Sequence, residues 1–232
     1  MASFYYSSVD EFLTKSDDHI LASLGKNYAG YGYTSLFSEQ TVTWERDIRS
    51  LRKTLEDCVS LSQSAQSWGV FLEFSIPRKE KRIDIVILVK DVIVVLEAKA
   101  GPAASQAKRQ VEEYALLLHY FHKKSADLRI VPIVVSPNAG EPNPSAVNQR
   151  NLFPQLPSYW ISQVIFSSWK ELPDLLTAAD DSFSEQIPVD AWNDSPYFPV
   201  PSIFEAALAL RSGLSIREIA HSEASGMQFR SM

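Results

Sequence analysis

Three charged residues, Asp84, Glu97 and Lys99, interrupt a segment (82–99) that is otherwise rich in Ile and Val. The segment consists of two apolar runs that meet at Lys90-Asp91. A hairpin with this turn places Asp84 opposite Glu97, and Lys99 two residues farther along on the same face. Carboxylates that face each other across two strands repel, more strongly where water is scarce. The pattern therefore predicts a positive group between them, which Lys99 supplies in part and a hard divalent cation supplies more fully.

Both runs are too short for helices and apolar on both faces, which is typical of central strands covered on two sides. Strict alternation assigns Ile83, Ile85 and Leu96 to the face opposite the charges. The turn lacks the Gly that tight hairpins prefer, so the register is a hypothesis, and a shift by two residues keeps the same faces. An alternative is that Glu97 and Lys99 form a surface ion pair on an edge strand. The apolar surroundings favour burial, and buried carboxylates need partners or metals.

The neighbouring elements are expected to bring further polar groups to the same end of the sheet. Strand 70–76 places Glu73 on the face opposite its apolar residues, where it is either a third carboxylate near Asp84 or a surface residue. The helix predicted from about residue 102 to 121 carries Gln110 and Tyr114 on one face, four residues apart. Their amide and hydroxyl groups either orient a phosphate or a water beside the carboxylates, or make ordinary packing contacts between helix and sheet.

Hydrophobic periodicity predicts the remaining elements. An amphipathic helix covers 44–58, and strand 128–136 is parallel to the preceding strand because a helix crosses over between them. A fifth strand is predicted at 161–166. The fold class is therefore α/β, with an αβββαβ core in which helices flank a central mixed sheet. His119 and His122 are interpreted as helix-surface residues, because no third metal ligand is evident beside them.

The spacing of Asp84, twelve residues and then Glu97-Ala98-Lys99 resembles the D…(D/E)-x-K signature of the PD-(D/E)XK nuclease superfamily, with Ile83 in place of the nominal Pro. Gln110 and Tyr114 are similar to the Q-x-x-x-Y element of RecB-like and lambda-exonuclease-like members. Most of residues 40–220 resembles the nuclease-type domain that precedes Schlafen-like P-loop ATPase/helicases of bacteria.

The resemblance implies a restriction-endonuclease-like fold in which Asp84, Glu97 and the backbone carbonyl of Ala98 hold Mg²⁺ or Mn²⁺. It also implies that Lys99 positions the attacking water or stabilises the developing oxyanion. In several families of the superfamily the first helix adds an acidic ligand, and Glu45 is the residue at that place in this chain. The alternative role of Glu45 is an ion pair with the residue one helical turn later, Arg49.

Two segments are expected: a nuclease-like domain at 1–180, with a core at about 40–136, and a Pro-rich lid or linker with a C-terminal helix at 181–232. The eight aromatic residues of 1–37 are expected to form a packed cap, with base stacking as the alternative. The chain contains no G-x-x-x-x-G-K-[ST] motif. The resemblance implies a partner ATPase/helicase, which is then expected as a separate polypeptide or as a C-terminal domain absent from this sequence.

Composition narrows the class of protein. The 232 residues, 45% of them hydrophobic, are enough for one large soluble domain. The single cysteine, Cys58, excludes an internal disulfide and is expected in the core. No apolar run approaches the roughly 18 residues that span a bilayer, so we expect no membrane partner and a cytoplasmic location.

Charge is uneven along the chain. The net charge of −6 argues against a nucleic-acid partner, but residues 78–129 hold eleven Lys/Arg against seven Asp/Glu. Phosphate binding needs local rather than global positive charge. The expected function is thus metal-dependent hydrolysis of phosphodiester bonds in nucleic acid, with DNA favoured over RNA as the substrate. The resemblance also implies defence against foreign DNA. The alternative is a catalytically inactive module of the same fold that binds nucleic acid or a partner protein, and a homodimer is left open.

Overall fold

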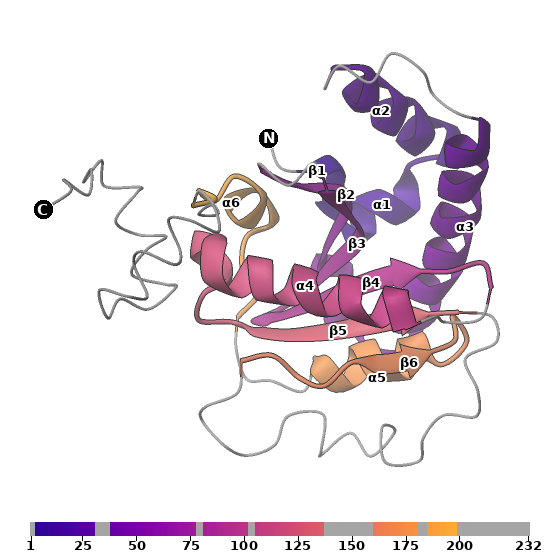
Figure 1. Ribbon diagram of the computed structural model, residues 1–232. Coiled ribbons are helices and arrows are strands. Elements are labelled where there is room, and N and C mark those ends of the chain that lie inside the picture. The colour runs from indigo at the N-terminus through magenta and orange to yellow at the C-terminus, as the bar shows by residue number, and fades with distance from the viewer. Residues whose placement is uncertain are drawn as a thin grey trace, which may run out of the picture.

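A six-stranded mixed β-sheet with helices on both faces forms the centre of the protein (Figure 1). A computed structural model describes residues 3–30, 38–77, 81–101, 105–136, 160–180 and 185–198. The strands lie in the sheet in the order in which they occur in the chain. They are β1 (Ser3–Ser8), β2 (Gly69–Ile76), β3 (Lys81–Val89), β4 (Val92–Ala98), β5 (Arg129–Val135) and β6 (Ile165–Ser167). Strands β1 to β4 pair antiparallel, whereas β5 is parallel to β4 and to β6.

The helices divide between the two faces of the sheet (Figure 1). One face, which we call the α3 face, is covered by α1 (Val9–Thr14), α2 (Asp17–Gly30), α3 (Ser38–Leu61) and α5 (Leu172–Ala179). The other face, the α4 face, is covered by α4 (Ser105–Phe121) and α6 (Val189–Asn193). Two short 3₁₀ helices, η1 (Gln63–Ser67) and η2 (Lys123–Ser125), complete the regular structure of the described ranges. Every residue of β4 is buried, as expected for a strand covered on both sides.

The predicted order of elements and the predicted register of the hairpin are confirmed. The order α3-β2-β3-β4-α4-β5 matches αβββαβ. Val89 pairs with Val92 and Ile85 pairs with Leu96, which is the register expected from a turn at Lys90-Asp91. The turn forms without Gly because Lys90 itself adopts a left-handed backbone conformation, with φ 52°. The α/β class with helices on both faces of a mixed sheet is thus established, while its assignment to the nuclease superfamily stays a prediction.

The predicted faces of β2 and β3 are wrong on one side of Glu73 and Asp84, where Phe74, Ile76 and Ile83 lie on the α4 face. Leu72 packs in the core of the α3 face, but Phe74, two residues later, packs in the core of the α4 face. Ile83 and Ile85 on β3 are divided between the two cores in the same way. The cause lies in Glu73, whose φ of 51° breaks the alternation of side chains along the strand.

The N-terminal segment contains a strand that periodicity did not predict, the edge strand β1. The rings of Phe4, Phe12 and Tyr28 are buried in the core of the α3 face, so they are not available for base stacking. Tyr31, Tyr33 and Phe37 lie outside the described residues, as does the loop predicted at 137–158.

Part of the predicted C-terminal segment, 185–198, packs against the sheet. Trp192 is fully buried between Phe71 and Phe74, and Phe198 N donates to the carbonyl of Phe121. His122 is only 1% exposed and lies beside the same indole, so its interpretation as a surface residue is wrong. The helix predicted near 203–210 lies outside the described residues. No helix within the described ranges combines the length and the apolar character needed to cross a membrane.

Candidate metal centre

The ends of β3 and β4 bring Asp84, Glu97 and Lys99 together. The pairing of β3 with β4 ends at Ile85 and Leu96, and Asp84 is the residue of β3 just beyond the last pair. Asp84 Oδ2 accepts a hydrogen bond from the backbone amide of Ala98 at 3.2 Å, so its carboxylate lies beside the end of β4. Lys99 Nζ donates to Glu97 Oε1 at 2.5 Å. The three residues predicted from their spacing therefore form one cluster.

Glu97 is the most deeply buried member of this cluster, with 1% of its surface exposed. Lys99 occupies one carboxylate oxygen, but the other, Oε2, is buried and has no hydrogen-bond partner among the described residues. A buried carboxylate oxygen without a donor carries a large desolvation cost. An ion or an ordered water at Oε2 would offset that cost. The alternative of a surface ion pair on an edge strand does not hold, because β4 is central and Glu97 is buried.

The electrostatics of the cluster favour an added positive charge. Burial raises the pKa of the Asp84 carboxyl well above its ordinary value, and the charges of Glu97 and Glu73 raise it further. Burial likewise raises the pKa of Glu97, against the opposing effect of the Lys99 ammonium. One ammonium group therefore does not offset the burial and mutual repulsion of these carboxylates.

Glu73 lies close enough for its charge to raise the pKa values of Asp84 and Glu97, but both of its own oxygens already accept hydrogen bonds. Its Oε1 accepts from the indole of Trp44 at 2.8 Å, and its Oε2 accepts from Arg82 Nε at 2.5 Å. Only 6% of Glu73 is exposed, which excludes the alternative of a surface residue. The structure thus places Glu73 beside the cluster as a third carboxylate with its hydrogen-bonding capacity directed elsewhere.

The acidic residue that α3 contributes is Asp47 rather than Glu45. Glu45 is exposed, whereas Asp47 is buried, and its charge acts on Glu97. Burial raises the pKa of Asp47, while the adjacent Arg46, whose Nε donates to Asp47 Oδ1 at 2.9 Å, opposes this. Asp47 follows Trp44 by three residues, which places it on the buried stripe of the helix. The three-residue spacing from Trp44 is the feature of the sequence that could have identified Asp47 as a buried acidic residue.

Gln110 and Tyr114 face the cluster from α4. Gln110 Nε2 donates to Tyr114 Oη at 2.8 Å, and the Tyr114 side chain is almost entirely buried. Burial raises the pKa of the Tyr114 hydroxyl, and the charges of Glu97 and Asp84 raise it further. The hydroxyl therefore stays protonated, and because its oxygen accepts from Gln110, its own proton is left to donate to a second acceptor.

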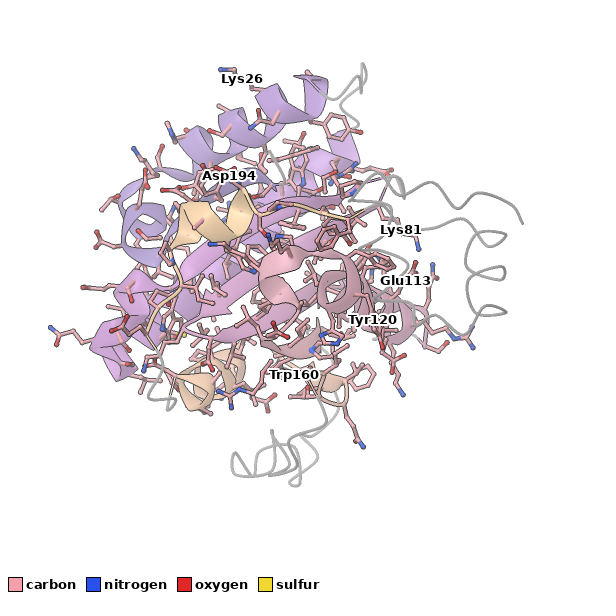
Figure 2. All side chains as sticks on the ribbon, turned by 90° about the vertical axis from the view of Figure 1, so that its left-hand side faces the viewer. Lys26, Lys81, Glu113, Tyr120, Trp160 and Asp194 are labelled. Atoms are coloured by element: carbon pink, nitrogen blue, oxygen red, sulfur yellow. The ribbon has the colours of Figure 1, made fainter. Side chains whose placement is uncertain are left out.

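An exposed ion pair connects α4 to β3 beside these groups. Lys81 Nζ lies 2.7 Å from Glu113 Oε2, and both side chains can be followed in Figure 2. Glu113 precedes Tyr114, and Lys81 is three residues before Asp84. The ion pair therefore links the helix that carries the hydroxyl to the strand that carries the carboxylate, whose packing is set by the apolar core of the α4 face.

The residues present fit a hard divalent cation held by few protein ligands. Within the described ranges, no three His, Cys, Asp or Glu side chains converge tightly enough to coordinate an ion by themselves. Mg²⁺ is commonly held by one or two carboxylates, with waters and substrate phosphates completing its coordination. Asp84, the Oε2 of Glu97 and the Ala98 carbonyl are the groups that would hold it.

No protein-family model, curated protein or solved structure matches the chain. The chemistry of the cluster is therefore argued from its own geometry and from the motif described above.

Proposed function

We propose that the protein is a metal-dependent nuclease that hydrolyses phosphodiester bonds, with the catalytic centre at Asp84, Glu97 and Lys99. The observation that carries this proposal is the buried Oε2 of Glu97, which has no hydrogen-bond partner in the described part of the chain and lies beside a second carboxylate and an ammonium group. A module that only binds nucleic acid has no use for buried carboxylates that repel each other. A bound Mg²⁺ or Mn²⁺ would supply a Lewis acid that neutralises phosphoryl charge and makes water a better nucleophile.

The protein's own residues have separable roles in this proposal. Glu97 anchors the Lys99 ammonium, whose side chain remains 37% exposed and can therefore reach a substrate phosphate or the attacking water. An ammonium group at that place stabilises the negative charge that develops in the transition state. Tyr114, held by Gln110, donates its hydroxyl proton to an oxygen in the cluster and so orients the reacting groups.

The charge around the cluster is compatible with a nucleic-acid backbone. Much of the basic excess predicted for 78–129 is balanced, because Lys81, Arg82, Lys90, Lys99, Lys108 and Arg129 all form ion pairs. The pair between Lys108 and Glu112 at the start of α4 is long, at 3.8 Å, and half exposed. Exposed pairs of this kind contribute little to stability, so Lys108 can exchange its carboxylate for a phosphate. Arg109, also exposed, adjoins it.

The direct test is incubation of the purified chain with linear, circular and single-stranded DNA and with RNA. Each substrate is given Mg²⁺, Mn²⁺ or a chelator, and cleavage is followed on gels. We expect cleavage with metal, none with chelator, and loss of cleavage in Asp84→Asn and Glu97→Gln. Asp91→Asn is the matched control, because Asp91 lies on the same hairpin and pairs with Arg129 away from the cluster. Metal-independent cleavage, or equal cleavage by all variants, would contradict the proposal.

A further inference from the structure

The carboxylate of Glu73 links three elements beside the candidate metal centre. From β2, it accepts the Trp44 indole N–H of α3 at 2.8 Å and Arg82 Nε of β3 at 2.5 Å. The bond to Trp44 is buried, since Glu73 is 6% exposed and Trp44 is 5% exposed, and the bond to Arg82 is partly buried. Hydrogen bonds of buried carboxylates to charged and indole donors are among the stronger ones in proteins.

The backbone of β2 is distorted at this residue. Glu73 has φ 51° in the middle of a strand, a conformation that side chains other than glycine rarely adopt. The preceding Leu72 packs toward the α3 face and the following Phe74 toward the α4 face. The distortion is what lets the Glu73 carboxylate reach Trp44 on α3, because undistorted alternation would place it with Phe71 on the α4 side.

Both donors are close in sequence to an acidic residue at the candidate site. Trp44 is one helical turn before Asp47, and Arg82 is two residues before Asp84 on β3. The Arg82 guanidinium also lies over the rings of Phe4 and Tyr28, at 5.4 and 5.5 Å from their centroids. A donor held on two rings and a carboxylate has little freedom, so Glu73 connects the cluster to rigid surroundings.

We infer that Glu73 is a positioning residue of the proposed nuclease site and not a ligand of its metal: it holds Trp44 and Arg82 so that Asp47 and Asp84 face Glu97. This inference rests on the proposed function. A ligand would have to direct an oxygen at the ion, whereas both oxygens of Glu73 are occupied, one by the buried Trp44 indole and one by the partly buried Arg82 guanidinium. Exchange of those donors for a metal would leave the buried Trp44 indole N–H without the acceptor that it has in this structure.

The Trp44 indole N–H reports directly on this arrangement. The five tryptophans give five indole signals in a ¹⁵N-resolved NMR spectrum, and Trp44→Phe identifies the relevant one. Titration with MgCl₂ should move backbone amides at Glu97 to Lys99 and leave the Trp44 indole protected from hydrogen exchange. The indoles of Trp68 and Trp192, which donate to Asp180 and Ser125, are internal references for an intact fold. Loss of Trp44 protection on adding Mg²⁺ would mean that Glu73 has turned to the metal, and the inference would be wrong.

Two variants extend the test to metal affinity. Glu73→Gln leaves one acceptor oxygen for two donors, and the charged Arg82 guanidinium is the stronger competitor for it, so the new NH₂ group faces the Trp44 indole and cannot accept from it. Exchange of that indole should speed up by about 10- to 100-fold, the factor expected for losing a hydrogen bond to a charged acceptor. Trp44→Phe removes the donor without changing any charge. If Glu73 acts by positioning, each variant should weaken Mg²⁺ binding or activity, typically by about 10- to 100-fold, and the double variant should be no worse than Glu73→Gln. Trp160→Phe, at a partly exposed indole, is the matched control and should change nothing.

A metal ligand predicts a different pattern. Glu73→Gln would then weaken Mg²⁺ binding strongly, while Trp44→Phe would leave it unchanged, and this result would overturn the inference. Failure of the proposed function is recognised separately. Absence of cleavage in a chain that binds Mg²⁺ would overturn the nuclease assignment and leave the NMR result standing. A chain in which Mg²⁺ moves no amide near Glu97 would overturn the metal centre and the inference together.

Discussion

Removal of one carboxylate by Asp84→Asn has opposite effects on the protein with and without metal. Without metal, Asp84 faces Glu97 and Glu73 in surroundings poor in water, and Lys99 neutralises only part of this charge. Asparagine keeps an oxygen that can accept from the Ala98 amide, so the contact between β3 and β4 survives. The substitution therefore removes charge and a proposed metal ligand while leaving the fold intact.

The magnitudes follow from general relations. An ion at about 100 times its Kd stabilises the folded chain by about 2.7 kcal/mol, which corresponds to about 5–10 °C in Tm for a chain of this size. If Asp84→Asn weakens the site about 100-fold, the same metal concentration adds only about 0.4 kcal/mol, or about 1 °C. In chelator, Asp84→Asn should be the more stable of the two proteins, because facing like charges destabilise a strand pair by about 0.2–1 kcal/mol. The variant should then melt up to about 4 °C above the wild type.

The assay is thermal unfolding followed by circular dichroism, for both proteins, in chelator and over a series of MgCl₂ and MnCl₂ concentrations. Asp91→Asn serves as the charge-matched control and should show the wild-type response to metal. Two results would refute the reasoning: a wild-type Tm that metal does not change, or an equal metal response in Asp84→Asn and the wild type.

Three further predictions concern acidity, catalysis and packing. Because the pKa values of Asp84 and Glu97 are raised in the folded state, the folded chain binds protons more tightly than the unfolded chain. In chelator, the stability advantage of Asp84→Asn over the wild type should therefore shrink as pH falls from neutral toward about 4, as urea unfolding at each pH would measure. Tyr114→Phe should lower kcat by about 10- to 100-fold with little change in nucleic-acid affinity, in steady-state cleavage and binding assays. Trp192→Ala should cost about 3–5 kcal/mol in urea unfolding, because the indole is fully buried, whereas Trp160→Ala should stay within about 0.5 kcal/mol.

Regular features of the sheet could be predicted from the sequence because they depend on short-range pattern. The register of β3 and β4 follows from two apolar runs and a turn between them, and the structure has the expected pairs. The parallel arrangement of β4 and β5 follows from the helix that connects them. The distortion at Glu73 could not be predicted, because no rule of composition marks a non-glycine residue that adopts a positive φ.

The candidate site was predictable where it depends on strand alternation and less so where it depends on distant packing. Asp84, Glu97 and Lys99 meet as their spacing requires. Asp47 was overlooked in favour of Glu45, although its place on the apolar stripe of α3 favours burial. The engagement of Glu73 by Trp44 and Arg82 depends on how α3 docks on the sheet, which local periodicity does not define.

The role of the Lys99 ammonium tests the central claim most directly, because it would differ between a nuclease and a module that only binds nucleic acid. In a nuclease, Lys99→Ala should abolish metal-dependent cleavage and leave nucleic-acid affinity nearly unchanged, since the ammonium acts on the water or the transition state. In a binding module, Lys99 is one phosphate contact among several.

Cleavage and salt-dependent affinity should therefore be measured on the same two proteins, wild type and Lys99→Ala, with Lys108→Ala as a control cation on the neighbouring helix. The nuclease account predicts cleavage by the wild type and by Lys108→Ala, none by Lys99→Ala, and parallel salt dependences of binding for the wild type and Lys99→Ala. A wild type that does not cleave with any metal, together with a salt slope reduced by about one unit in Lys99→Ala, would contradict it.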